Sequence, residues 1–339
     1  MMKTAIQHAL AGRDLSFDDA FESMQHIMTG KATDAQIGAF LIAMRMKNET
    51  PEEIAAFAQS MRTNAMAVSH KHGNSAVDLV GTGGDGKHTF NISTVAALVV
   101  AGAGIPVAKH GNHSVSSKCG SADVLQALGV NIELDNIRLG HCLDEVGIAF
   151  IFAPMVHPAM KYAIGPRRDI GVRSFFNILG PITNPAGVTR QLIGVYSPDL
   201  LMPLAKVLEK LGAEHIMLVH SRDGLDEIAL AGKTDVVELK NGTISSYEVG
   251  PDTFGISGSS AAIIGGNAAE NAETAKSILG GECGPARDIV IANAAAGLFV
   301  SGKFEDFQAA AHAAATSIDS GAASKKLDDL ISCSQRLGE

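Results

Sequence analysis

From residue 76 onward the chain alternates short apolar runs with helical patterns, and this alternation limits the possible folds more than any other feature. We expect strands near residues 76–80, 105–109, 130–134, 148–153, 190–196 and 215–220. Most of these runs are separated by amphipathic stretches such as "LLMPLAKVLEKLG". This order is typical of a mostly parallel sheet covered by helices.

The end of this region departs from simple alternation. Residues 236–249 read as a β-hairpin that turns at Asn241-Gly242, because Asn-Gly favours the tight turns that join antiparallel strands. Residues 265–339 are rich in Ala and are expected to be mainly helical. The sequence therefore predicts one sheet with an antiparallel hairpin and a helical C-terminal part.

The first 70 residues have helical spacing of their apolar side chains throughout. Ser16 stands at an expected helix N-cap, and Gly30 ends the helix that begins there. A second helix is expected from about Thr33. Thr50 is followed three residues later by Glu53, which is the spacing of a capping box. Three helices are therefore expected here.

These two patterns divide the chain into a helical and an α/β domain. We assign residues 1–72 to the helical domain, and residues 73–159 and 189–339 to the α/β domain. The segment 160–188 is rich in Pro and Gly and does not fit the alternation. We expect it to cross over and contribute to the helical domain.

Composition excludes several classes of protein. A hydrophobic content of 46% and a charged content of 19% are globular values, and no apolar run reaches the roughly 18 residues of a membrane span. The formal net charge of −9 argues against a nucleic-acid partner. The N-terminus offers no secretion signal, and the cysteines lie far apart with no C-x-x-C pair. We expect a cytoplasmic protein with reduced thiols and neither a membrane nor a nucleic acid as partner.

The stretch "AVDLVGTGGDGKHTFNIST", residues 76–94, resembles two phosphate loops but satisfies neither in context. The dinucleotide pattern G-x-G-x-x-G begins at Gly81, yet the next strand ends in Lys109-His110 where a dinucleotide fold needs an acidic residue. The P-loop pattern also begins at Gly81, but His88 replaces the hydroxyl that binds magnesium. A different anion site is therefore indicated.

Two polar clusters follow neighbouring strands and lead into helices. Asn91, Ser93 and Thr94 would place amides and hydroxyls at the positive end of one helix, although Asn91 could also be only an N-cap. The second cluster, "KHGNHSVSSKCGSAD" at 109–123, has the same context after the next strand. Two such clusters predict a ligand with two separate phosphate groups.

A third polar element, "SRDGLDEIAL", follows the expected strand at 215–220. Its adjacent carboxylates, Asp226 and Glu227, suit magnesium ions bridged by a diphosphate, because magnesium takes carboxylate oxygens together with substrate phosphate. Asp85 is expected to assist by holding metal-bound water. The alternative is a solvated acidic loop.

Taken together, "GTGGDGKHTFNIST", "KHGN…SSK.GSADVL.ALG", "GPRRDIGVRSFFNILGPITNP" and "SRDGLDE" resemble the anthranilate phosphoribosyltransferase family. The resemblance implies transfer of phosphoribose from 5-phosphoribosyl 1-pyrophosphate to the amine of anthranilate in tryptophan biosynthesis. It also implies a small N-terminal α-helical domain hinged to a larger α/β domain with a mostly parallel sheet, the class II nucleoside phosphorylase-like phosphoribosyltransferase fold. Two Mg²⁺ ions per site and a homodimer formed through the helical domain are further implications.

The resemblance also assigns site residues. The phosphoribosyl diphosphate would contact Gly81, Gly84, Asp85, Thr89, Asn91, Ser93, Thr94, Lys109, Asn112, Ser117 and Ser121. Anthranilate would meet Gly81, Asn112 and Arg167, with His110, His157 and Gly180 near its path. The metal ligands would be Ser93, Asp226 and Glu227. No residue is assigned as a catalytic acid or base, because an aromatic amine is already neutral at pH 7.

Arg167 is expected to bind the anthranilate carboxylate as a fork. Arg168 and Arg173 are alternatives, which we expect to be structural. His113 departs from the family pattern, which usually has Arg directly after "KHGN". A titratable cation replaces a permanent one there, so substrate binding at this position is in question.

Two other functions fit the same architecture. A pyrimidine nucleoside phosphorylase attacks the same sugar carbon with phosphate, but it would not need the Asp226-Glu227 pair. A non-catalytic relative could bind nucleic acid on this scaffold, and the acidic net charge argues against it.

Overall fold

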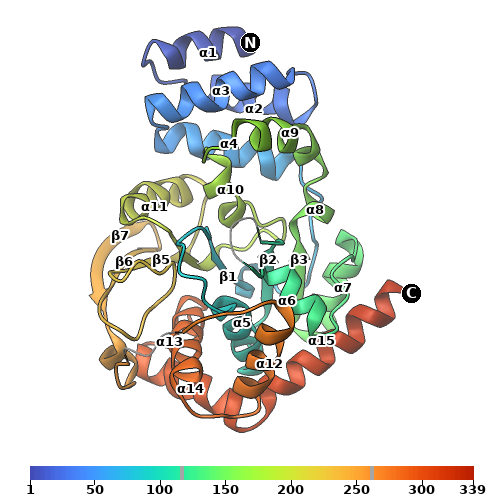
Figure 1. The fold of residues 1–339 in the computed structure, drawn as a ribbon, viewed down its shortest axis with the longest axis vertical. Helices are drawn as coiled ribbons and strands as arrows, with labels where there is room; N and C mark the ends of the chain where they lie inside the picture. The colour runs from blue at the N-terminus through green and yellow to red at the C-terminus, as the bar shows by residue number, and fades with distance from the viewer. Residues whose placement is uncertain (115–117, 260–262) are drawn as a thin grey trace.

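The protein has a helical end and an α/β end (Figure 1). The computed structural model describes residues 1–114, 118–259 and 263–339. The N-terminal helices are α1 (Met2–Leu10), α2 (Phe17–Met28), α3 (Asp34–Lys47) and α4 (Pro51–Thr63). Ser16, Thr33 and Thr50 cap α2, α3 and α4 with their side chains, and Glu53 completes the capping box of α4. These predicted helix starts are confirmed.

The larger part is built on a seven-stranded sheet with the order β3-β2-β1-β4-β5-β6-β7. The strands are β1 (Val77–Gly81), β2 (Val107–Gly111), β3 (Ile148–Phe152), β4 (Arg190–Gly194), β5 (His215–Ser221), β6 (Thr234–Lys240) and β7 (Thr243–Val249). Strands β1 to β5 pair in parallel, while β6 pairs antiparallel with both β5 and β7. The predicted fold class, with its mostly parallel sheet and terminal hairpin, is confirmed.

Eight of the helices that follow β1 surround the sheet. They are α5 (Ile92–Gly102), α6 (Ser121–Ala127), α7 (Asn136–Val146), α11 (Leu201–Lys210), α12 (Ala268–Leu279), α13 (Pro285–Val300), α14 (Phe307–Asp319) and α15 (Ala322–Gly338). Of these, α5 and α13 lie against β1, α7 against β3 and α11 against β5. Helix α5 lies among β1, α13 and α15, and nine of its residues are buried. This explains why its sequence is apolar on all sides rather than amphipathic.

The crossover segment contains α8 (Ala153–Val156), α9 (Lys161–Ile170) and α10 (Phe176–Ile182). Helix α9 packs against α2 and α3, although more than 100 residues separate it from them, and Figure 1 shows it beside these helices. Phe175, just before α10, stacks on Phe57 of α4 with ring centroids 4.4 Å apart. This packing supports the proposed contribution of residues 160–188 to the helical domain.

One expected strand was wrong. Residues 130–134 are extended but pair with no strand in the described structure. Ile132 and Leu134 are buried, and the amide of Asn131 donates to Ser334 Oγ of α15 at 3.0 Å. Alternate burial here comes from packing against a helix, which produces the same apolar pattern as a half-buried strand.

The sheet brings the predicted functional loops to one edge. The parallel strands β1, β2, β4 and β5 end at Gly81, Gly111, Gly194 and Ser221, and the register pairs Gly81 directly with Gly194. Ligands of open α/β sheets bind at this carboxyl edge.

Within the described ranges, no helix has the length and apolar character that a membrane crossing requires.

Candidate active site

The glycine loop between β1 and α5 lies directly against Asp226. The amide of Gly83 donates to Asp226 Oδ2 at 2.8 Å. A Cβ atom on Gly81 would lie 2.7 Å from the same oxygen, so only glycine permits this approach. Gly83, Gly84 and Gly86 all have positive φ angles, between 64° and 79°, which disfavour other residues. The loop and the predicted metal site are therefore in contact.

The N-terminus of α5 lies next to Glu227. The amide of Ser93 donates to Glu227 Oε1 at 3.2 Å. Asn91 occupies the N-cap position but makes no capping hydrogen bond, because its side chain bonds to Cys119 O at 3.2 Å and to Asn271 Nδ2 at 3.0 Å. Asn91 therefore stands at the N-cap position but does not cap α5 with its side chain. Thr94 is buried, and its hydroxyl has no partner among the described residues.

Lys109 is buried in the middle of β2, and its ammonium group reaches Ser93 at the start of α5. Its Nζ donates to Leu79 O at 2.5 Å and to Ser93 Oγ at 3.4 Å. Burial lowers the pKa of Lys109, and the negative charges of Asp78 and Glu227 oppose that shift. An anion bound at this edge would meet a cation held in a low-dielectric environment.

A buried network that the sequence analysis missed supports this strand end. Asp78 is fully buried and accepts hydrogen bonds from the amide of His110 at 3.2 Å and from Asn184 Nδ2 at 2.9 Å. Asn184 Nδ2 also donates to Ala108 O at 2.8 Å. Burial raises the pKa of Asp78 to about 6, against the charge of Lys109. The network ties the crossover segment to strand β2.

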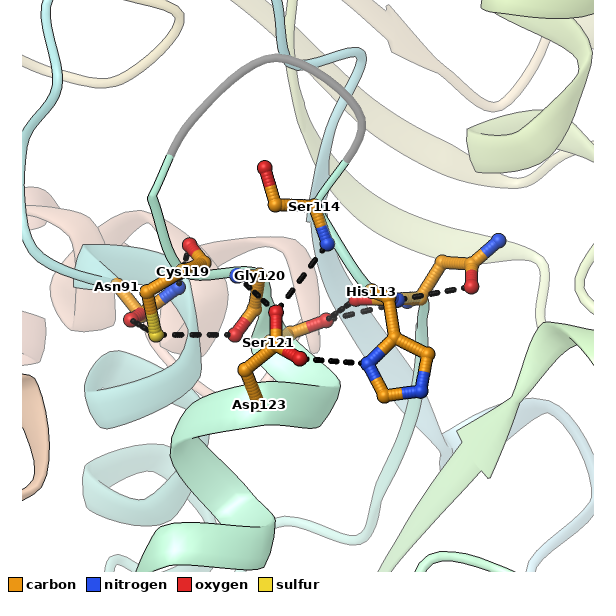
Figure 2. A network of polar contacts seen from close by, with 8 residues as sticks. Asn91, His113, Ser114, Cys119, Gly120, Ser121 and Asp123 are labelled. Atoms are coloured by element: carbon orange, nitrogen blue, oxygen red, sulfur yellow. Dashed lines mark hydrogen bonds and ion pairs between the residues drawn. The ribbon is translucent and has the colours of Figure 1, made fainter. Parts of the chain in front are cut away.

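Figure 2 shows the loop that follows β2, together with Asp123 of α6, whose carboxylate has three partners in that loop. Its carboxylate accepts from the amides of Gly120 at 2.6 Å and Ser114 at 3.3 Å, and it pairs with His113 Nδ1 at 2.6 Å. Burial alone would raise the pKa of Asp123, but these hydrogen bonds outweigh burial and lower it. The residue that departs from the family pattern, His113, is thus held by a carboxylate of α6.

The other predicted residues of this loop are only partly described. Asn112 and Ser121 hold each other, because Ser121 Oγ accepts from the amide of Asn112 and donates to its carbonyl, both at 3.2 Å. Ser117 lies outside the described residues. Thr89 lies farther along the glycine loop, next to Gly265, and makes no described contact with the carboxylates.

Asp226 and Glu227 are partly buried rather than solvated. Burial raises the pKa of Asp226, and the negative charge of Asp85 raises it further. Burial and the charge of Asp226 raise the pKa of Glu227 to about 8. Three carboxylates therefore repel one another around the glycine loop, and this placement disfavours the alternative of a solvated acidic loop.

These carboxylates fit a magnesium site that is completed by substrate. No cluster of three or more His, Cys, Asp or Glu side chains with metal-binding geometry occurs in the part of the chain that the structure describes. Magnesium does not require such a cluster, because it commonly uses one or two carboxylates together with waters and substrate phosphates. A divalent cation would also relieve the repulsion between Asp226 and Glu227.

Two buried histidines lie where anthranilate is expected. His110 Nδ1 bonds to Gly180 O at 3.1 Å, and the rings of His110 and His157 are 5.2 Å apart between centroids. Burial lowers the pKa of His110 to about 3 and that of His157 to about 4, so both rings are neutral at pH 7. The Nε2 atoms of both rings are buried, and neither has a partner among the described residues.

Arg167 and Arg168 of the crossover have different surroundings. Arg167 lies over the ring of Phe176 in α10, 5.0 Å from its centroid, and has no ion pair within the described ranges. Burial lowers the pKa of Arg167. The Arg168 side chain is 80% exposed and lies beside Asp169. Among the described residues, no hydrogen bond or ion pair occupies the Arg167 guanidinium, and no contact joins it to Asn112 or Gly81.

Comparisons with known proteins match this arrangement over nearly the whole chain. The model of the glycosyl transferase family helical bundle domain matches residues 3–65, and that of the glycosyl transferase family a/b domain matches residues 73–324. These two matches define a two-domain glycosyl transferase. An anthranilate phosphoribosyltransferase from Moorella thermoacetica is 51% identical and is covered over 98% of both chains. The chain belongs to the anthranilate phosphoribosyltransferase family.

Solved structures agree with this assignment. The anthranilate phosphoribosyltransferase of Thermus thermophilus superposes with a TM-score of 0.92 at 39% identity, over 98% of this chain and 99% of that one. The Saccharomyces cerevisiae enzyme in complex with PRPP and Mg superposes with a TM-score of 0.90 at 26% identity, over 99% of this chain and 98% of that one.

Proposed function

We propose which residues of this chain perform the family reaction. That reaction transfers the phosphoribosyl group from 5-phosphoribosyl 1-pyrophosphate to the amine of anthranilate, releases pyrophosphate, and belongs to tryptophan biosynthesis. The proposal is carried by one observation: Asp226 contacts the glycine loop while Glu227 contacts the N-terminus of α5. Both anion-binding elements therefore share a pair of carboxylates.

The diphosphate is assigned to the loop from Gly81 to Asp85 and to the first turn of α5. Loop amides and the helix N-terminus favour negative charge. Asp226 and Glu227 would hold Mg²⁺, with Ser93 as a further ligand, and we propose two ions per site. The complex of the yeast enzyme with PRPP and Mg supports magnesium here. When bound, magnesium neutralises charge on the departing pyrophosphate.

The remaining phosphoribosyl contacts are assigned to the two neighbouring helix starts. Asn91 and Thr94 would contribute at α5, Lys109 from within β2, and Asn112 and Ser121 at the start of α6. Lys109 suits this role because its buried ammonium faces Ser93 Oγ at 3.4 Å. A preorganised cation in a low-dielectric site stabilises phosphate charge without further reorganisation.

Anthranilate is assigned to the space between the crossover and the sheet edge. Arg167 would bind its carboxylate through two parallel hydrogen bonds. His110 and His157 are neutral and keep buried Nε2 acceptors, which suits the N–H groups of a neutral aromatic amine. Gly81, Asn112 and Gly180 would complete this part of the site. No deprotonation is needed before the amine attacks the anomeric carbon.

Quaternary structure and location are also part of the proposal. We expect a homodimer formed through the helical domain. Met46 of α3 and Leu10 of α1 are large apolar residues with exposed fractions of 74% and 67% at this end of the molecule, which supports such a contact. A cytoplasmic location is retained as an expectation from the sequence.

The other two functions are less well supported. A pyrimidine nucleoside phosphorylase has no use for the partly buried pair of Asp226 and Glu227, and the relatives at about 50% identity are anthranilate phosphoribosyltransferases. A nucleic-acid-binding role is disfavoured by the net charge of −9, because such binding depends on an excess of Lys and Arg.

The first expected result is a loss of anthranilate fluorescence when 5-phosphoribosyl 1-pyrophosphate and Mg²⁺ are added to the protein. The product carries a substituted amine, so the signal of free anthranilate falls as the reaction proceeds. The same mixture without Mg²⁺ should keep its fluorescence. A signal that stays constant at saturating substrates and Mg²⁺ would reject the assignment.

A further inference from the structure

Arg173, which the sequence analysis set aside as structural, contacts the glycine loop. It lies between α9 and α10, and its Nη2 donates to Gly84 O at 2.6 Å. Its guanidinium also lies over the ring of Tyr196, 4.2 Å from the centroid. Tyr196 follows β4, and its amide donates to Thr82 Oγ1 at 3.0 Å. The guanidinium is thus fixed between the loop and a residue that itself bonds to the loop.

The same residue is held from the helical domain. Arg45, near the end of α3, donates from Nη1 to the carbonyl of Arg173 at 2.8 Å. The chain of contacts therefore runs from α3, through the backbone and side chain of Arg173, to Gly84. Each link joins segments far apart in the sequence: 128 residues separate Arg45 from Arg173, and 89 separate Arg173 from Gly84.

Two features of Gly84 favour this contact. Its φ of 79° is unfavourable for residues with a side chain. A Cβ atom at this position would also lie 2.6 Å from Arg173 Nη2. A side chain at position 84 would therefore strain the backbone and displace the Arg173 guanidinium from its present place.

A glycine-rich loop must lose much conformational freedom when it binds an anion. An anchor that orders the loop beforehand reduces this cost and strengthens binding. Arg173 is suited to this task, because a charged donor makes a strong hydrogen bond to a carbonyl and the ring of Tyr196 holds the guanidinium in place. The opposite end of the anchor is fixed to the helical domain by Arg45.

We propose that Arg173 is a positioning residue that orders the glycine loop for the sugar diphosphate and couples this order to the placement of the helical domain. The link to the reaction rests on the proposed function of the loop. Arg173 acts through Gly84 and not by touching the reacting atoms, so its loss should raise KM for the sugar diphosphate and leave kcat and the anthranilate KM nearly unchanged.

The test compares Arg173→Met with Arg168→Met, a matched control. Both remove one arginine charge from an exposed position of the crossover, but Arg168 lies beside Asp169 and has no hydrogen bond to the glycine loop among the described residues. Hydrogen exchange of the peptide covering residues 81–90 should become faster in Arg173→Met without ligand and stay unchanged in the control. We expect KM for 5-phosphoribosyl 1-pyrophosphate to rise about tenfold in Arg173→Met alone.

Arg45→Met tests the coupling to the helical domain. It should speed exchange of the same peptide, and the double variant with Arg173→Met should be little worse than Arg173→Met alone, because both changes break one chain of contacts. Fully additive effects would overturn the coupling. Thermal unfolding of all variants shows whether the fold is intact, and Arg173→Lys, which keeps the charge, should recover part of the lost affinity.

The outcomes separate this inference from the proposed function. A raised KM with unchanged exchange would mean that Arg173 binds the substrate directly, and it would overturn the positioning role. Faster exchange with an unchanged KM would mean that order in the free loop does not strengthen binding of the sugar diphosphate, and it would also overturn the positioning role. A failed fluorescence assay of the unaltered protein would instead contradict the proposed function.

Discussion

Replacing Asp226 by Asn is expected to lower kcat/KM for 5-phosphoribosyl 1-pyrophosphate by about hundredfold at limiting Mg²⁺, the scale of losses seen when a metal site is weakened. Asn keeps an oxygen that can accept from the amide of Gly83, so the glycine loop should stay in place. What is lost is a negative charge at a partly buried position next to Glu227. Steady-state kinetics over a series of Mg²⁺ concentrations measure this effect, and raising Mg²⁺ should restore part of the activity.

Asp223→Asn is the matched control for this variant. Asp223 lies three residues away in the same loop, is exposed, and accepts from the amide of Leu225 at 3.3 Å, a bond that Asn can retain. It should show the Mg²⁺ dependence of the unaltered protein. If Asp226→Asn also kept that dependence and its full turnover, Asp226 would have no role in metal binding.

Replacing Arg167 by Ala is expected to weaken anthranilate binding by about 1.5–3 kcal/mol, the range for hydrogen bonds to charged groups, which corresponds to about a 10- to 150-fold rise in the anthranilate KM. The guanidinium has no ion pair among the described residues and rests on the ring of Phe176, so its hydrogen-bonding groups are available to a carboxylate. Initial rates at varied anthranilate and saturating sugar diphosphate measure the change.

Arg168→Ala serves as the control for Arg167→Ala. The Arg168 side chain is 80% exposed and its nearest ion-pair partner, Asp169 Oδ1, is 3.6 Å away, so its removal should alter neither KM appreciably. An Arg167→Ala effect confined to the KM for the sugar diphosphate would contradict the carboxylate role and would place Arg167 on the other substrate.

Much of the fold could be predicted because its signals are local. The helix starts at Ser16, Thr33 and Thr50 depend on residues within one turn, and the hairpin at Asn241-Gly242 depends on a dipeptide. The expected strand at 130–134 failed because local alternation does not show whether the buried side chains face a strand or a helix.

The sequence indicated which loops form the candidate site, but not the contacts that support those loops. The position of Asp226 after an expected strand, together with the family resemblance, indicated a metal site beside the diphosphate, whereas the 2.8 Å contact with Gly83 depends on the pairing of β1 with β4. The hydrogen bond of Asn184 to Asp78 spans 106 residues, and that of Arg173 to Gly84 spans 89. No periodicity or motif in one sequence indicates partners at such separations.

The most direct measurement of the central claim is a crystal structure of the protein with 5-phosphoribosyl 1-pyrophosphate and Mn²⁺ in place of Mg²⁺, with the metal located by anomalous scattering. We expect anomalous peaks between the carboxylates of Asp226 and Glu227 and the diphosphate, with the diphosphate lying on the loop from Gly81 to Asp85. Metal and diphosphate bound away from this loop, or a diphosphate on the loop with no metal beside Asp226 and Glu227, would contradict the claim.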